Sequence, residues 1–432
     1  MRVPFFVLLL SCLLVGLGVG LPLGSVVETM AKGFRHIVVA LAPIIFLGII
    51  LGALLDLSGS TRVMAASILK KVGDGRAALA MNITGLIVGL PIFCDSGFIV
   101  LSGLNRSLAE RTRVPMAFMT VSLASGLYAI HCLIPPHPGA AAAASLIGVD
   151  VGRLMLTGTL AAIPSAFAGY CWARFAGRGG KPGEGVKVSG SGGMSTGDEE
   201  IQGPGDDGKT SGNADNMIGK IQRPGDAGVT VTMAFLPVVV PILLIAIKPW
   251  IGVPGTPVAA LSVGILLAMI CGRGWTKKVL GGLLWSSVKK AASILVIIGA
   301  GGAFGAVLAT THMGDQLGAA LPLARMGIFF PFLLTSLLKT AQGSSTVAII
   351  TAASIVKPVL TTLGLATGNG PILCILSMGA GSMMISHAND AYFWVIARFS
   401  GLDMRTMLKV YTVATLLMGV TAYLTVYLIS CI

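Results

Sequence analysis

Four short stretches of this sequence place polar and ionisable residues inside long apolar segments. They read PIFCDSGF (91–98), HCLIPPHPG (131–139), KTAQGSSTVA (339–348) and SHANDAYFW (386–394). Each contains proline, glycine or consecutive small polar residues, which interrupt a helix. Because backbone N–H and C=O groups cannot stay unpaired in lipid, irregular chain at membrane depth has to line a protein cavity. The four breaks are therefore the candidate binding site.

The third and fourth breaks offer the chemistry that binds a hydroxylated acid. A helix beginning after Gly343 would present free N–H groups and hydroxyls to a carboxylate, aided by the helix dipole. The fourth break adds the donors and acceptors that a polyol needs. The combination favours a small hydroxy acid over a cation or a lipid. The candidate substrate-binding residues are Asp95, Ser96, Gly97, His131, Pro136, His137, Gly343, Ser344, Ser345, Thr346, Ser386, His387, Asn389 and Asp390.

Two intramembrane acids are the candidates for binding a driving proton. A substrate anion beside an ionised carboxylate would place two negative charges in a low-dielectric cavity, and protonation removes that clash. Asp95 is preferred, with a nearby histidine, because the matching hairpin of the second half carries only neutral serines. Asp390 stays open, together with His387, because an Asn-Asp pair can equally cap a helix break. Lys339 is expected to pair with an acid, to touch the substrate or to snorkel.

The composition makes lipid the main solvent of the chain. Of 432 residues, 54% are hydrophobic and 11% are charged, whereas a soluble domain carries about 25% charged residues. The net charge of +13 is spread over short loops and not over one basic face, so nucleic acid is not an expected partner. The seven cysteines show no CxxC spacing, and neither a metal site nor a cofactor is predicted. We expect an all-α integral membrane protein.

The elements that must position the breaks come from two apolar halves that resemble each other. The segment near Gly52 can be laid on that near Gly305, and the segment from Gly148 on that from Gly401, both at an offset of 253. Such duplication is typical of transporters built from inverted repeats with broken helices. We expect a first repeat at 1–176, a flexible cytoplasmic linker at 177–230 and a second repeat at 231–432.

Each half is expected to carry one re-entrant hairpin, at 78–105 and 323–363. The first half lacks a counterpart to 233–251 and is therefore expected to be one helix shorter. A signal peptide is the alternative interpretation of 4–22, which the repeat disfavours. The predicted spans are 4–22, 37–56, 114–148, 153–174, 233–251, 256–272, 288–309, 370–398 and 408–430.

Loop charges predict the orientation. Under the positive-inside rule, the excess of lysine and arginine places the linker in the cytoplasm and Ile432 outside. Lys289 and Lys290 count among the cytoplasmic loop charges in this layout. It makes the two hairpins enter from opposite sides, the arrangement that binds substrate near the midplane.

The four breaks resemble, in order, the motifs of the gluconate permease family. HCLIPPHPG is similar to that family's His-x-x-x-Pro-Pro-His-Pro-Gly, GSSTVA to Gly-Ser-x-Thr-Val-Ala, and SHANDAYFW to Ser-His-x-Asn-Asp-x-x-Phe-Trp. FCDSGF matches an aromatic, acid and Gly-Phe pattern. The likeness covers nearly the whole chain apart from the linker. The chain departs from it at Ala391 and Tyr392, where Pro-Gly is frequent, at the alanine run 140–144, and in the missing first helix.

The resemblance implies a multi-pass permease of the bacterial inner membrane that imports gluconate or a related sugar acid by proton symport. It also implies the ion-transporter superfamily architecture, with elevator movement of a substrate-carrying domain, and it allows a homodimer. D-Serine and glycerate are alternative substrates. An intramembrane enzyme, a channel and a non-transporting receptor are the competing functions. An enzyme would need a nucleophile with a base, or paired acids, and would leave the duplication of the breaks unexplained.

Overall fold

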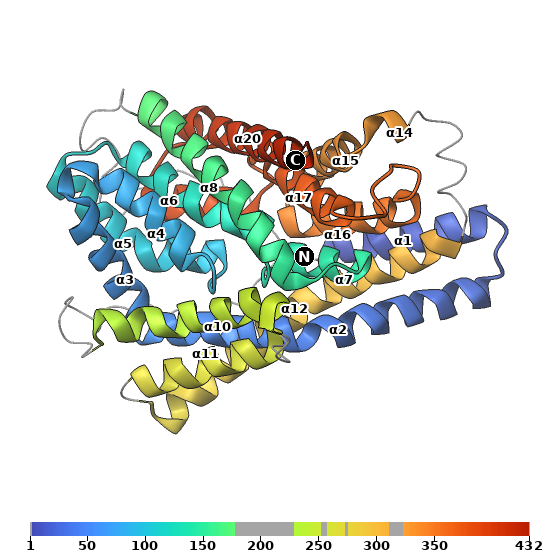
Figure 1. The fold of residues 1–432 in the computed structure, drawn as a ribbon, viewed down its shortest axis with the longest axis horizontal. Helices are drawn as coiled ribbons and strands as arrows, with labels where there is room; N and C mark the ends of the chain where they lie inside the picture. The colour runs from blue at the N-terminus through green and yellow to red at the C-terminus, as the bar shows by residue number, and fades with distance from the viewer. Residues whose placement is uncertain (1, 178–228, 252–256, 273–274, 311–322, 432) are drawn as a thin grey trace, which may run out of the picture.

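The computed structural model describes the chain apart from residues 1, 178–228, 252–256, 273–274, 311–322 and 432. In that part the chain is nearly all helical and contains no β-strand (Figure 1). The predicted all-α class is confirmed. The linker predicted at 177–230 lies almost wholly outside the described residues.

The helices fall into two groups separated by that linker. The first group is α1 (Arg2–Gly18), α2 (Leu23–Leu57), α3 (Ser60–Val72), η1 (Asp74–Arg76), α4 (Ala77–Val88), α5 (Cys94–Thr112), α6 (Met116–Leu133), α7 (Pro138–Ile147) and α8 (Val151–Ala176). The second group is α10 (Val231–Ile251), α11 (Pro257–Cys271), α12 (Lys277–Thr310), α14 (Leu323–Met326), α15 (Phe329–Gln342), α16 (Ser345–Val356), η3 (Lys357–Val359), α17 (Gly370–Met383), α18 (Ala391–Ser400), α19 (Met404–Thr406), η4 (Met407–Thr412) and α20 (Val413–Ser430).

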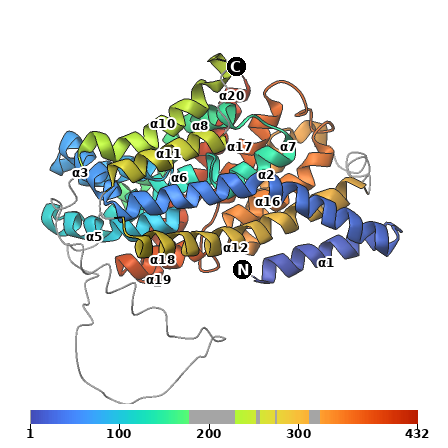
Figure 2. The same ribbon diagram turned by 90° about the horizontal axis from the view of Figure 1, so that it is seen from below.

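Helix bounds recur along the chain with the spacing found in the sequence. α7 (138–147) and α18 (391–400) are displaced by 253 residues at both ends. The long helices α2 and α12 are displaced by nearly the same amount and lie side by side (Figures 1 and 2). The Ser165 hydroxyl of α8 donates to the Met418 carbonyl of α20 at 3.0 Å, and the sequence alignment superposes these two residues. The repeat boundaries themselves stay a prediction.

Five helical stretches are long and apolar enough to cross a membrane, judged by length and composition. They are Leu23–Leu57, Met116–Ile147, Val151–Ala176, Lys277–Thr310 and Met404–Ser430. Two of them exceed the predicted spans 37–56 and 288–309. The charged residues placed in the flanking loops, Lys289 and Lys290 among them, continue α12 instead. The prediction was wrong there because hydropathy alone does not show a helix running on past a pair of charges.

A glycine-rich run in α12, residues 299–305, lets this helix lie against two neighbours. A Cβ atom on Gly33 of α2 would overlap the carbonyl of Gly302. On another side of α12, the Ser354 hydroxyl of α16 donates to the Gly301 carbonyl at 2.9 Å. The run is therefore a helix-packing surface, and it holds α12 next to the second hairpin.

All four predicted breaks are interruptions between consecutive helices. Two are the tips of the helical hairpins α4–α5 and α15–α16, and two divide the broken segments α6–α7 and α17–α18. In Figure 1, α2, α10, α11 and α12 form one layer, and the hairpins and broken segments lie above it. The breaks therefore meet one another beside α12.

Candidate functional site

A cavity of about 410 Å³ lies where the breaks meet α12. Its wall takes 93–95 from the first hairpin, 342–347 from the second and 389–392 from the α17–α18 break. α6, the start of α7 and residues 290–297 of α12 complete it. Ligand sites for small molecules commonly measure about 300 to 1,000 Å³. The volume therefore suits a small organic molecule.

Four helices begin at this cavity. The wall includes the first residues of α5, α7, α16 and α18. The first turn of a helix has backbone N–H groups without a partner inside the helix, and the dipole makes that end positive. Negative charge stabilises such an end, which is how helix N-termini bind anions. The convergence makes the cavity a favourable place for a carboxylate.

A buried ion pair joins the second hairpin to the α17–α18 break. Lys339 Nζ lies 2.7 Å from Asp390 Oδ2, with side-chain exposures of 0% and 8%. The same oxygen accepts a hydrogen bond of 2.5 Å from the Ser386 hydroxyl, and Oδ1 accepts one of 3.0 Å from the Tyr392 N–H. Lys339 also donates to the Gly343 carbonyl. Asp390 is thus a helix cap with a permanent counter-charge, which weakens its candidacy as the proton site.

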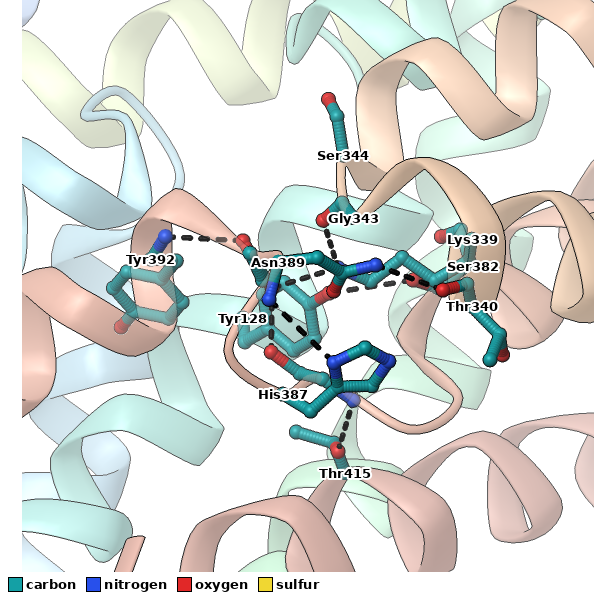
Figure 3. Close-up of polar contacts among 12 residues, drawn as sticks. Tyr128, Lys339, Thr340, Gly343, Ser344, Ser382, His387, Asn389, Tyr392 and Thr415 are labelled. Atoms are coloured by element: carbon teal, nitrogen blue, oxygen red, sulfur yellow. Dashed lines mark hydrogen bonds and ion pairs between the residues drawn. The ribbon is translucent and has the colours of Figure 1, made fainter. Parts of the chain in front are cut away.

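The tip of the second hairpin fits closely against the same break. Gly343 has φ +79°, and a Cβ atom there would overlap the backbone carbonyl of Asn389. Glycine alone meets both requirements at low cost. The Asn389 side-chain amide donates to the Thr340 carbonyl at 2.8 Å. Figure 3 shows Lys339, Gly343 and Asn389 gathered at this junction. The two breaks therefore act as one wall of the cavity.

The third break has the geometry expected of an anion site. Ser344 is the N-cap of α16, and its hydroxyl accepts a hydrogen bond of 3.4 Å from the Val347 N–H. Ser344, Ser345 and Thr346 all lie on the cavity wall. Because the cap is a neutral serine, the positive end of α16 is not offset by a carboxylate. An anionic ligand gains most at this helix end.

Asp95 occupies the opposite side of the cavity, in the first turn of α5. One contact of its carboxylate is the Cys94 thiol, 3.7 Å from Oδ1. No cation in the described part of the chain forms an ion pair with it, in contrast to Asp390. Asp95 is therefore the acid whose charge is less compensated.

The two histidines of the second break have different surroundings. His137 Nε2 is 2.7 Å from the Gly89 carbonyl and supports the first hairpin from outside the cavity wall. His131 lies on the wall, and its Nδ1 is buried without a hydrogen-bond partner. Gln342 Oε1, also on the wall, is likewise unpartnered. Buried polar atoms are nearly always paired in native proteins, so these two atoms are ready for ligand hydroxyls.

The structure brings most of the predicted residues together and sets others apart. On the wall are Asp95, His131, Gly343, Ser344, Ser345, Thr346, Asn389 and Asp390. Off the wall are Ser96, Gly97, Pro136, His137, Ser386 and His387. Several of the second set serve the framework instead: Pro136 lines a separate apolar cleft with α10 and α11, and a Cβ on Gly97 would press on Leu127. A role in binding for these residues stays a prediction.

Sequence reasoning missed several polar residues of the wall, among them Lys290 and Gln342. Lys290 lies on α12, with Ser293, Ile294 and Ile297 on the same stripe. The signal was present, because Lys290 directly precedes the largely apolar run 291–309. Gln342 directly precedes Gly343 and closes α15. The packing of α12 places Lys290 on the wall, and the position of the second hairpin places Gln342 there.

Comparison with known proteins assigns the family. The GntP family permease model matches residues 1–199 and 226–432. The chain belongs to the GntP permease family. Inner membrane permease YgbN of Escherichia coli is 30% identical, with 98% of this chain and 92% of the relative covered. Gluconate permease of Pseudomonas aeruginosa is 29% identical over 99% of this chain and 92% of that protein. The resemblance inferred from the four motifs is confirmed.

A solved structure supports the fold of this GntP permease. The crystal structure of the Alcanivorax borkumensis YdaH transporter, described by its title as having an unusual topology, matches with a TM-score of 0.54 at 14% identity. The match covers 99% of this chain and 98% of that one. Together with the five stretches that are long and apolar enough to cross a membrane, family membership supports a multi-pass protein of the inner membrane.

Replacing one partner of the buried ion pair should lower the stability of the protein far more than replacing both partners. We expect Lys339→Met or Asp390→Asn alone to lose about 3 to 5 kcal/mol of stability, because each leaves a buried group without its partner. The double variant should recover much of that loss. The measurement is thermal unfolding of detergent-purified protein.

The exposed pair Arg111–Asp74, whose charged atoms lie 2.8 Å apart, is the matched control for this experiment. Its single variants should change stability by less than about 1 kcal/mol. An Asp390→Asn protein as stable as the wild type would contradict the structural role of the pair.

Proposed function

We propose that this GntP permease imports a small monocarboxylic hydroxy acid of the gluconate type by proton symport. The observation that carries the proposal is the cavity at which four helices begin, since their N-terminal ends favour an anion. The hydroxyls of Ser344, Ser345 and Thr346 and the unpartnered atoms of His131 and Gln342 suit the hydroxyl groups of a sugar acid.

The relatives support the same substrate class. Besides the Pseudomonas protein, an Escherichia coli relative that is 27% identical over 99% of this chain is named an L-idonate transporter. Gluconate and L-idonate share one carboxylate and a chain of hydroxyls. D-Serine and glycerate, which also carry one carboxylate and a neighbouring polar group, are the alternative substrates.

We assign the driving proton to Asp95. Asp390 already forms an ion pair with Lys339, whereas Asp95 faces the cavity and forms no ion pair with a described cation. Binding a substrate anion next to ionised Asp95 would cost electrostatic energy, and a proton on Asp95 removes this cost. The loaded carrier then moves by the elevator mechanism, in which the hairpins and broken segments, which form most of the cavity wall, move past the layer of α2 and α12. No cofactor is required beyond the proton gradient.

An uptake assay tests the substrate class. In proteoliposomes with an imposed inward proton gradient, we expect labelled gluconate to accumulate chemically unchanged. Unlabelled gluconate, glucuronate, glycerate and D-serine, added separately, rank the substrates by competition. Recovery of a modified product would favour an intramembrane enzyme. Equilibration without accumulation, whatever the gradient, would favour a channel. Absence of all uptake would contradict the proposal.

The coupling role of Asp95 has its own test. Asp95→Asn should abolish gradient-driven accumulation, because the amide cannot take up a proton, and should retain much of the substrate counterflow seen without a gradient. Asp74→Asn, which changes an exposed acid paired with Arg111, is the matched control and should affect neither. If Asp95→Asn protein still concentrates substrate against its gradient, the proton binds elsewhere.

A further inference from the structure

Lys290 is the cavity residue that neither the motifs nor the coupling scheme uses. It lies on α12, in the layer opposite the breaks, and its side chain reaches the cavity wall. Nζ donates to the Ser96 hydroxyl at 2.8 Å and sits 4.8 Å from the centre of the Phe93 ring. Both partners belong to the tip of the first hairpin. The ammonium group is therefore held at the rim of the cavity.

No other lysine or arginine lines this cavity in the described part of the chain. Lys339 forms a buried ion pair with Asp390. Lys290 makes no ion pair with a described acid, and its partners are a neutral hydroxyl and an aromatic face. A cation held by such weak partners keeps most of its capacity to bind a carboxylate. From these contacts we infer that Lys290 binds the carboxylate of the transported acid.

The charges around the cavity agree with this inference, which rests on the proposed function. Asp390 and Lys339 offset each other, which leaves Asp95 and Lys290. The other titratable side chains of the wall, Cys94, Tyr128, His131 and Tyr392, are types whose ordinary pKa makes them mainly neutral at pH 7. In the empty carrier, ionised Asp95 offsets Lys290. In the loaded carrier, Asp95 is protonated and the substrate carboxylate offsets Lys290.

A substrate with one negative charge therefore leaves the cavity without net charge in both the empty and the loaded carrier. An uncompensated charge in a low-dielectric site is costly. The inference therefore specifies the substrate class as monovalent acids. A dicarboxylate of the same length, such as glucarate, would bring one charge that no described group on the wall offsets.

The test compares an acid with its neutral amide. Binding of gluconate and of gluconamide is measured by calorimetry on purified wild type, Lys290→Gln, Lys290→Arg and Lys289→Gln. Lys289 is the matched control, because it adjoins Lys290 on the same helix, is exposed and does not line the cavity. Lys290→Gln should weaken gluconate about ten- to a hundred-fold, the usual effect of losing a charged hydrogen-bond partner, and leave gluconamide unchanged. Lys290→Arg and Lys289→Gln should bind gluconate as the wild type does.

Four outcomes overturn the assignment. If Lys290→Gln loses affinity for gluconate and gluconamide equally, Lys290 is a structural support of the first hairpin. Equal affinity of the wild type for gluconate, gluconamide and glucarate would overturn it without any variant. If Lys290→Gln binds gluconate as tightly as the wild type does, and the wild type takes up gluconate, Lys290 does not bind the carboxylate and the proposed function stands. If the wild type binds none of the acids in the uptake panel, both the role of Lys290 and the proposed function are contradicted.

Discussion

The shape of the cavity depends on the buried contact between Lys339 and Asp390. Removing two charges from water costs several kcal/mol for each ion, and only close geometry with further hydrogen bonds offsets that cost. Ser386, Tyr392 and the Gly343 carbonyl supply those bonds. The result is that the second hairpin and the α17–α18 break, which are separate in the sequence, present a single wall. The N-terminus of α16 is thereby held facing the first hairpin, and the positive helix ends converge on one point.

The charges of the site follow from this arrangement. Asp390 is paired with Lys339. The acid of the cavity wall that forms no such pair is therefore Asp95, and the cation of the wall is Lys290 on the other layer. A symport cycle requires a group that changes charge and a group that does not. Asp95 suits the first role, and Lys290 suits the second. The two halves therefore contribute different chemistry although their helices repeat: the first hairpin carries an acid, and the second a neutral serine cap.

Much of this could be predicted from the sequence, and the failures have physical causes. The apolar periodicity and the offset of 253 anticipated the hairpins and broken helices, because proline, glycine and polar residues interrupt apolar helices in few ways. Asp95, Thr346 and Asn389 were found because they lie at those interruptions. Lys290 was missed because it lies inside an unbroken helix, where only the packing of α12 decides which way it faces. His137 and Ser386 were grouped with the site, yet their hydrogen bonds go to Gly89 and Asp390. Proximity along the chain does not distinguish a ligand-facing side chain from one that supports the framework.

Substrate protection of a single thiol tests the central claim most directly, that the acid occupies the cavity at the N-terminus of α16. Thr346→Cys is made in a background in which all seven native cysteines, including Cys94 of the wall, are replaced by alanine, and its alkylation by a small maleimide is timed. We predict that the transported acid slows the reaction in proportion to its occupancy. The neutral amide should protect only at higher concentration. A cysteine at Thr367, in an exposed loop away from the cavity, should react at the same rate with and without substrate. Labelling of Thr346→Cys at an unchanged rate under saturating substrate, in protein that still transports, would contradict the account.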